Sequence, residues 1–247
     1  MSLAWVDGEI MPAQEATVPL LCHGLHYGTA VFEGIRAYAT PRGPALFRLD
    51  DHLDRLLDSA TLYALEIPYS RDELRAATHE LVARSGLASC YVRPIAFPVS
   101  ADGTMRVCPL GASTTVAIAV WEWGAYLGEA GKRDGIRAKV SSWQRISEES
   151  LLPAAKAAGH YLNSVLASVE AQRAGYEEAI LLDSTGHVSE GAAENVFVVR
   201  DGRIATPTLC NAILDGITRQ STIATSGSRS PSATSAATSS TSPTRCS

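Results

Sequence analysis

The chain has 247 residues, of which 46% are hydrophobic and 19% charged, so it can bury a sizeable core and is long enough for two modest domains. Its net charge of −5 and the absence of a basic run exclude the electrostatic footprint of a nucleic-acid or anionic-membrane binder. We therefore expect a small molecule or another protein as the partner.

The cysteines and the hydropathy pattern indicate the compartment. The five cysteines are scattered and contain no C-x-x-C pair, which argues against a disulfide framework or a structural zinc site. The chain begins without a basic and then apolar signal, and no segment reaches the roughly 18 apolar residues of a membrane span. These features predict reduced thiols, no metal and a cytoplasmic location.

Residues 1–123 are predicted to form a small α+β domain. Asp7-Gly8 favours a tight turn, so a hairpin is expected over residues 4–11. A short strand is expected over 17–21, and the alternation over 30–38 suits a strand with a bulge.

Two helices and two longer strands follow. Leucines at helical spacing predict a helix from Asp51 to about Leu65, with Asp50 as its N-cap. Ser70 and Glu73 form a capping box at the start of a second helix, which Gly86 ends. Branched and aromatic residues then predict strands over 90–97 and 114–123.

A glycine-rich stretch over residues 124–135 is the expected linker to a large domain over 136–224. This domain is predicted to contain strands over 136–141 and 178–182, a helix over 161–173 and a hairpin within 195–205. Large apolar residues recur at helical spacing in that helix and are expected to face the core. They are Leu162, Val165, Leu166 and Val169.

Residues 225–247 are rich in serine and threonine and lack large apolar side chains. Such a segment cannot bury enough surface to offset its ordering entropy, so we expect it to be disordered.

Lys156 is the residue on which a functional hypothesis depends. It is one of only three lysines, it lies among small apolar residues, and no acidic residue occurs within six positions of it. Such a lysine is commonly a solvated side chain whose stem covers apolar surface. Alternatively, it is a desolvated amine able to act as a nucleophile and form a Schiff base.

Several spaced motifs resemble those of one family, over about residues 5–223. Glu190-Gly191-Ala192-Ala193-Glu194-Asn195 and Leu214-Asp215-Gly216-Ile217-Thr218-Arg219 resemble the signature of the class IV aminotransferases, the fold type IV pyridoxal phosphate enzymes. Motifs of the branched-chain amino acid aminotransferases accompany them: Phe32-Glu33-Gly34-Ile35-Arg36, Tyr91-Val92-Arg93-Pro94 and Ala155-Lys156-Ala157-Ala158-Gly159-His160-Tyr161. The resemblance implies a two-domain fold with an incomplete C-terminal domain.

By this resemblance, the chain transfers amino groups between branched-chain L-amino acids (leucine, isoleucine and valine) and 2-oxoglutarate through an aldimine on Lys156. Glu190 would hold the pyridine nitrogen protonated, because a close carboxylate favours the cationic ring. Arg55 and the helix start at Thr218 would bind the phosphate. The full set of residues implied to bind pyridoxal 5′-phosphate is Arg55, Tyr161, Glu190, Glu194, Asn195, Leu214, Ile217 and Thr218.

The resemblance also implies a substrate pocket and an oligomer. An arginine suits the second carboxylate of glutamate, which needs a partner once it leaves water. The implied substrate-binding residues are Tyr27, Phe32, Arg36, Tyr91, Arg93, Trp123 and Tyr126. Tyr27 would reach the site from a partner subunit, so a homodimer or higher homo-oligomer is expected.

Two alternatives to this activity stay open on the sequence. One is another class IV enzyme, an aminodeoxychorismate lyase or a D-amino acid or amine transaminase. The other is an inactive remnant, because family members continue beyond the Gly-Ile-Thr-Arg helix, whereas the composition here changes at Thr225. We hypothesise a truncation or frameshift after about residue 224.

Overall fold

The computed structural model describes residues 2–100, 104–124 and 128–226. They divide into two compact units, one that runs up to Ile136 and includes Ala155–Leu162, and one formed by Arg137–Ala154 with the described residues from Asn163 onward. The division expected from the sequence differs for the segment Ala155–Leu162, which packs with the first unit although it follows the expected linker. None of the described helices is long and apolar enough to cross a membrane.

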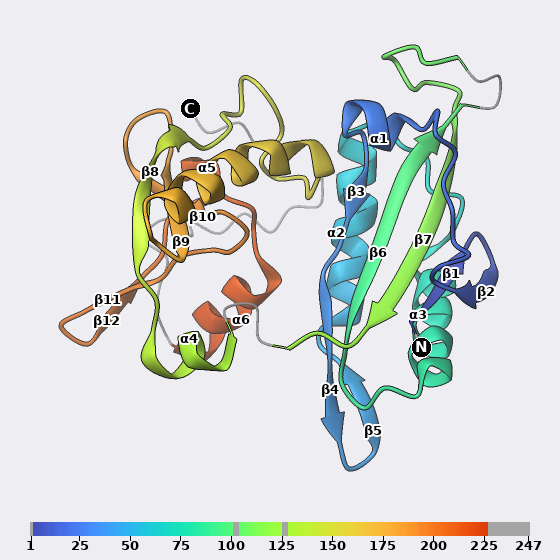
Figure 1. The fold of residues 1–247 in the computed structure, drawn as a ribbon, viewed down its shortest axis with the longest axis horizontal. Coiled ribbons are helices and arrows are strands. Elements are labelled where there is room, and N and C mark those ends of the chain that lie inside the picture. The colour runs from blue at the N-terminus through green and yellow to red at the C-terminus, as the bar shows by residue number, and fades with distance from the viewer. Residues whose placement is uncertain (1, 101–103, 125–127, 227–247) are drawn as a thin grey trace. The chain divides into compact units, whose positions relative to one another are not determined.

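The first unit is built on a seven-stranded antiparallel sheet (Figure 1). Its strands are β1 (Leu3–Val6), β2 (Glu9–Pro12), β3 (Val31–Phe32), β4 (Ile35–Thr40), β5 (Gly43–Leu46), β6 (Cys90–Val99) and β7 (Ser113–Trp121). The order is β2-β1-β7-β6-β4-β5, and β3 also pairs with β6. Its helices are α1 (His23–Tyr27), α2 (Leu49–Leu62), α3 (Arg71–Ser85) and α4 (Gly128–Asp134), with a 3₁₀ turn η1 (Ala158–His160).

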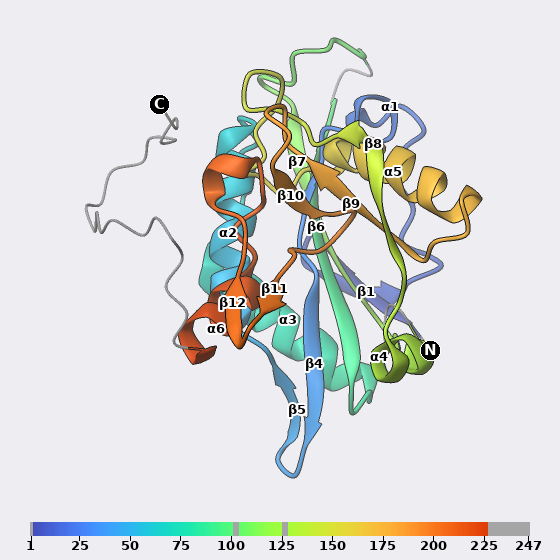
Figure 2. The same ribbon diagram turned by 90° about the vertical axis from the view of Figure 1, so that its left-hand side faces the viewer.

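The two faces of this sheet have different chemistry. Successive strand residues point to opposite faces, so alternate positions share an environment. One face carries Ile35, Val92 and Ile118, which are fully buried in the main hydrophobic cluster together with Leu53 of α2 and other helix residues. Helices α2 and α3 lie on one face of the sheet (Figure 2). The other face carries the polar and aromatic residues described below.

Two local predictions in this unit are confirmed. The first hairpin turns at Asp7 and Gly8, whose φ angles of 45° and 104° need the left-handed region. Helix α3 begins with the capping box between Ser70 and Glu73 and ends at Gly86, which has a φ of 68°.

Three other predictions are wrong in detail. No strand forms over residues 17–21; that segment leads into α1. Helix α2 begins at Leu49 after a left-handed Arg48, and Asp50 is inside the helix, where it pairs with Arg75 at 2.6 Å. The strand expected over 30–38 forms as β3 and β4, which pair with β6 in the same register on both sides of Glu33-Gly34, so the expected bulge is absent.

The second unit contains a three-stranded sheet in the order β10-β9-β8, in which β8 and β9 are parallel. Its strands are β8 (Ala138–Gln144), β9 (Glu178–Leu182) and β10 (Val188–Gly191), and a separate hairpin joins β11 (Val198–Arg200) to β12 (Arg203–Ala205). Helix α5 (Tyr161–Arg173) connects β8 to β9, and α6 (Ile217–Ser226) follows the 3₁₀ turn η2 (Leu209–Asn211). The tail predicted to be disordered lies outside the described residues, apart from Thr225 and Ser226 at the end of α6.

Helix α5 packs through its small residues, which corrects the expected core face. Ala167 and Ala171 are at most 1% exposed and pack against Ala179 and Leu181 of β9. The large residues point outward: Leu162, Val165, Leu166 and Val169 are 72%, 55%, 44% and 40% exposed. Alanines allow the helix to approach the sheet closely, so periodicity alone assigned the wrong face.

The packing of α5 predicts a contrast between two enlarging substitutions. Ala167→Leu adds volume to a fully buried contact with β9 and should lower the free energy of unfolding by about 1–3 kcal/mol. Val165→Leu on the exposed side should change it by less than about 0.5 kcal/mol. Urea unfolding of the two variants measures both values, and equal effects would contradict the assignment of the buried face.

Candidate functional site

The backbone around Lys156 is fixed by pairing with the segment that contains β3. Phe32 donates its amide hydrogen to the Lys156 carbonyl at 3.0 Å, and Ala158 donates to Ala30 at 2.7 Å. Gly159 donates to Gly28 at 3.0 Å, and Ser59 Oγ accepts from the Lys156 amide at 3.0 Å. Lys156 is thereby held on the first unit despite its distance along the sequence.

The approach of these two segments requires glycine at position 28. Its φ is +68°, and a Cβ there would lie 2.9 Å from the Gly159 Cα atom. Both the conformation and the contact would strain any other residue.

The Lys156 side chain lies among aromatic rings. Its Nζ donates to Tyr161 Oη at 2.9 Å and lies 5.2 Å from the centre of the Phe32 ring. Ala155 and Ala157, which flank it, are at most 5% exposed. Within the described part of the first unit, no acidic side chain forms an ion pair with this amine. The amine is thus surrounded by aromatic rings and small apolar side chains.

The sheet face opposite the core carries a row of aromatic and cationic side chains. In the strand register, Arg36 of β4 lies opposite Tyr91 of β6, which lies opposite Trp121 of β7. Arg36 donates to the carbonyls of Trp123 and Gly124 at 2.7 and 2.8 Å, so it orders the segment after β7. The Trp123 ring packs edge-on against Tyr91 at 4.6 Å.

Arg93 lies in the same row because it is two residues from Tyr91 along β6. Its guanidinium carbon is 4.6 Å from the centre of the Phe32 ring, and its Nη2 donates to Tyr91 Oη at 3.1 Å. The Tyr91 hydroxyl occupies space that glycine leaves open, since a Cβ on Gly34 would be 2.0 Å from it. Phe32, Gly34, Tyr91 and Arg93 therefore form one packed wall.

Arg55 on α2 is paired with a residue that the sequence analysis did not select. Its Nε and Nη2 donate to the two oxygens of Glu33 at 2.6 and 2.8 Å, in a forked contact. His52 Nδ1 is 2.6 Å from Glu33 Oε2. Burial alone would raise the Glu33 pKa, but the hydrogen bonds and charges of His52 and Arg55 lower it to about 2.

The second unit has its own cluster around Glu190, which is 5% exposed. Glu190 Oε2 accepts from Asn195 Nδ2 at 3.0 Å and from the Leu214 amide at 3.1 Å. Its Oε1 lies 2.8 Å from Arg145 Nε, in an ion pair whose partners are less than 10% exposed. Arg145 was missed in the sequence, where it stands in a polar loop without a recognisable motif.

Asn195 joins the Glu190 strand to the start of α6. It donates to the Leu214 carbonyl at 2.9 Å, and its Oδ1 lies 1.9 Å from the position of a Cβ on Gly216. Gly216 immediately precedes α6, whose first residues are the expected phosphate-binding Ile217 and Thr218. Ile217 is buried and Thr218 exposed. A helix start of this kind favours an anion.

Glu194 faces another carboxylate, Glu178 of β9. The two side chains share a hydrogen bond, which requires a proton on one of them. Burial, that hydrogen bond and the charges of Glu178 and Glu190 raise the pKa of Glu194 to about 8. The Glu194–Glu178 pair therefore shares a proton at neutral pH, and sequence reasoning gave no sign of Glu178.

The expected site residues thus divide between the two units. The first holds Phe32, Arg36, Arg55, Tyr91, Arg93, Trp123, Lys156 and Tyr161, and the second holds Glu190, Glu194, Asn195, Leu214, Ile217 and Thr218. Tyr27 lies at the end of α1, is 42% exposed and donates to the Met105 carbonyl at 2.7 Å. Tyr126 lies outside the described residues.

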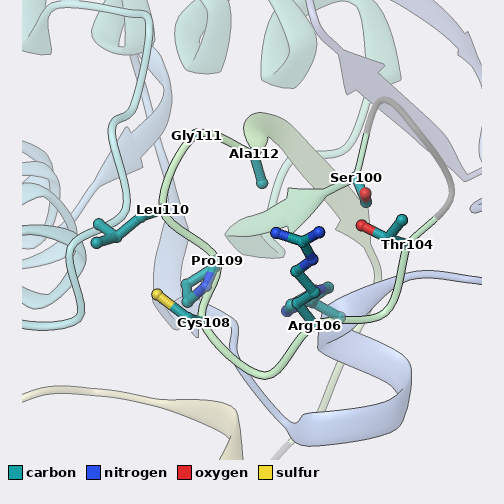
Figure 3. A pocket seen from close by; sticks show the side chains of 9 residues that line it. Ser100, Thr104, Arg106, Cys108, Pro109, Leu110, Gly111 and Ala112 are labelled. Carbon is teal, nitrogen blue, oxygen red and sulfur yellow. The ribbon is translucent and has the colours of Figure 1, made fainter.

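A separate cavity of about 310 Å³ lies near α1 and the loop between β6 and β7. Figure 3 shows this loop curving around the Arg106 side chain. The cavity is lined by His23, Ser100, Thr104, Arg106, Cys108, Pro109, Leu110, Gly111 and Ala112. It contains none of the expected catalytic or binding residues, so it is not the candidate site.

The first unit thus holds an amine beside an aromatic and cationic wall, and the second unit holds a buried carboxylate bonded to the segment before a helix start. The model of the amino-transferase class IV family matches residues 30–230, and the chain belongs to that family.

Individual relatives of the chain indicate one group of enzymes within this family. The chain is 46% identical to a branched-chain-amino-acid aminotransferase of Pseudomonas aeruginosa, over 87% of this chain and 69% of the relative. It is also 46% identical to the Escherichia coli K12 enzyme of that name, over 89% of this chain and 71% of the relative.

The solved structures to which this fold is similar belong to the same group of enzymes. The Escherichia coli branched-chain amino acid aminotransferase superposes with a TM-score of 0.86 at 45% identity, covering 90% of this chain and 73% of that one. The Thermobaculum terrenum enzyme, solved in its pyridoxal phosphate form, gives 0.80 at 36% identity, covering 90% and 71%. The predicted fold type IV, α+β architecture is confirmed.

The Glu194–Glu178 pair predicts a pH dependence of stability. The unfolded chain releases the Glu194 proton near its ordinary pKa of 4.5, whereas the folded chain keeps it to about 8. Between these values the folded state binds more protons, so this residue makes stability fall as pH rises, by up to about 1.4 kcal/mol per pH unit.

Glu194→Gln should remove this fall, because an amide can still donate to Glu178 without losing a proton. Urea unfolding at pH 5.5, 7 and 8.5 measures the slopes, with Glu66→Gln, at an exposed position, as the control. Parallel curves for the native protein and Glu194→Gln would show that the pair does not hold the proton.

Proposed function

We propose that this chain is a branched-chain-amino-acid aminotransferase, which moves the amino group of leucine, isoleucine or valine to 2-oxoglutarate with pyridoxal 5′-phosphate. The observation that carries the proposal is the placement of Lys156 Nζ beside Tyr161 Oη and the Phe32 ring, in a chain of this family.

The residues fit the chemical groups of the cofactor. In the first unit, Lys156 offers an amine for the carbonyl, Tyr161 a phenol for the ring hydroxyl and Arg55 a guanidinium for the phosphate. In the second, Glu190 offers a carboxylate for the ring nitrogen, and the start of α6 at Ile217 and Thr218 offers amides for the phosphate. Asn195 and Leu214 hold Glu190 through the bonds described above, and Glu194 supports that loop.

When bound, the cofactor supplies an electron sink for the electrons released at the substrate α-carbon. The protein must then move the α-proton, and we assign that task to Lys156 Nζ. Tyr161 Oη, 2.9 Å away, orients the amine. The Phe32 ring, whose centre is 5.2 Å from the amine, and the buried Ala155 and Ala157 surround it with apolar groups.

The substrate wall accounts for the two kinds of substrate. Phe32 and Trp123 present apolar ring surface to an aliphatic side chain. Arg93, held by Tyr91, presents a cation to a carboxylate such as the second one of glutamate. Arg36 shapes the wall by holding the Trp123 carbonyl.

We infer in addition that the active form is a homodimer or larger homo-oligomer that works in the cytoplasm. The exposed Tyr27, on α1, would complete the substrate site of a second copy.

The amine assignment predicts the effect of replacing Lys156. Lys156→Ala should lower kcat for leucine with 2-oxoglutarate by at least about 10⁴-fold, because both the nucleophile and the proton carrier are lost. Lys132→Ala, at an exposed position, should leave kcat unchanged.

Borohydride reduction of the protein with cofactor should add the cofactor mass to the peptide that contains Lys156. Labelling of a different lysine would contradict the assignment. Release of pyruvate from aminodeoxychorismate without transfer from leucine would instead identify a lyase.

The packed wall predicts the effect of a single methyl group at position 34. Gly34→Ala should displace the Tyr91 hydroxyl and, with it, Arg93, and raise KM for the amino acid about tenfold. Adding Tyr91→Phe removes the clashing oxygen, so the double variant should be more stable to urea than Gly34→Ala alone. A Gly34→Ala variant with unchanged KM and stability would show that the wall adapts.

A further inference from the structure

Among the described residues of the first unit, Glu33 is the least accessible charged one, with a side chain that is 0% exposed. It lies at the break between β3 and β4, and its backbone amide donates to the Pro94 carbonyl at 2.9 Å. Burying a carboxylate is costly unless strong hydrogen bonds compensate it. The bonds from Arg55 and His52 provide that compensation.

The same contacts fix the orientation of Arg55. A guanidinium on a long side chain has many rotamers, and a forked contact to a rigid carboxylate selects one plane. The Glu33 carboxylate is itself fixed by His52 Nδ1 at 2.6 Å and by the Gly34 amide at 3.3 Å. His52 and Arg55 are three residues apart on α2 and thus point to the same side.

We propose that Glu33 is a positioning residue for cofactor binding, which holds the Arg55 guanidinium ready for the phosphate group with His52 as its support. This inference rests on the proposed function, in which Arg55 binds that phosphate. Glu33 acts through Arg55 and has no contact with the reacting atoms.

Electrostatics and positioning predict opposite results when Glu33 loses its charge. The Glu33 anion partly neutralises Arg55, so removing it makes the site more positive and should tighten phosphate binding if charge alone mattered. If Glu33 works by orientation, its loss should weaken binding in spite of the added positive charge. The sign of the change therefore separates the two explanations.

The experiment compares pyridoxal 5′-phosphate with pyridoxal, which lacks the phosphate, by spectroscopic titration of the apoprotein. Glu33→Gln should raise the Kd for pyridoxal 5′-phosphate about tenfold, in the range of other supporting-residue losses, and leave the Kd for pyridoxal nearly unchanged. His52→Asn, which removes one of the bonds to Glu33, should give a smaller increase in the Kd for pyridoxal 5′-phosphate. It takes the place of Glu33→Gln in the test if that variant does not fold.

Two further variants complete the test. Glu170→Gln breaks an ion pair with Lys139 in the second unit and should alter neither Kd. Arg55→Ala should weaken binding of pyridoxal 5′-phosphate, and adding Glu33→Gln to it should have no further effect.

The outcomes are distinct. An unchanged Kd in Arg55→Ala would overturn the phosphate assignment and this inference together. Suppose that Arg55→Ala binds pyridoxal 5′-phosphate more weakly, whereas Glu33→Gln and His52→Asn bind it as tightly as the native protein or more tightly. That result would overturn this inference alone. Equal losses for pyridoxal and its phosphate in those two variants would show a general structural role and would also overturn it.

Discussion

The backbone hydrogen bonds between residues 28–32 and 156–159 are the constraint on which the first unit's half of the site depends. They attach a short segment to the small-domain sheet although about 120 residues separate the two in the sequence. The attachment uses main-chain atoms and small side chains, so it leaves the Lys156 side chain to point toward Tyr161 and Phe32. A reacting group must be held in a fixed position, and these main-chain hydrogen bonds fix the position of Lys156.

Much of the first unit could be predicted from the sequence because its signals are local. The Asp7-Gly8 turn and the Ser70–Glu73 capping box depend on residues only a few positions apart. The cap of α2 and the inner face of α5 could not be predicted, since they depend on what the helices meet: Asp50 pairs with Arg75, and the sheet accepts only the alanine side of α5.

The candidate site shows the same division. The family resemblance selected Lys156, Glu190 and Arg55 as expected site residues, but the residues that hold them were missed where the partners are remote in sequence. Glu33 is 22 positions from Arg55, and Arg145 is 45 positions before Glu190. Such buried ion pairs are invisible to periodicity, since a charged residue in a loop or at a strand end is usually solvated.

The contact between Asn195 and Gly216 has a consequence for how such chains can change over time. The two residues belong to stretches that look like independent signatures, yet the amide oxygen of one fills the space of the other's absent side chain. A larger residue at 216 would push Asn195 away from Glu190 and Leu214, and a larger residue at 195 would crowd the start of α6. A substitution at either position would therefore also disturb the other stretch, so one contact couples the two signatures.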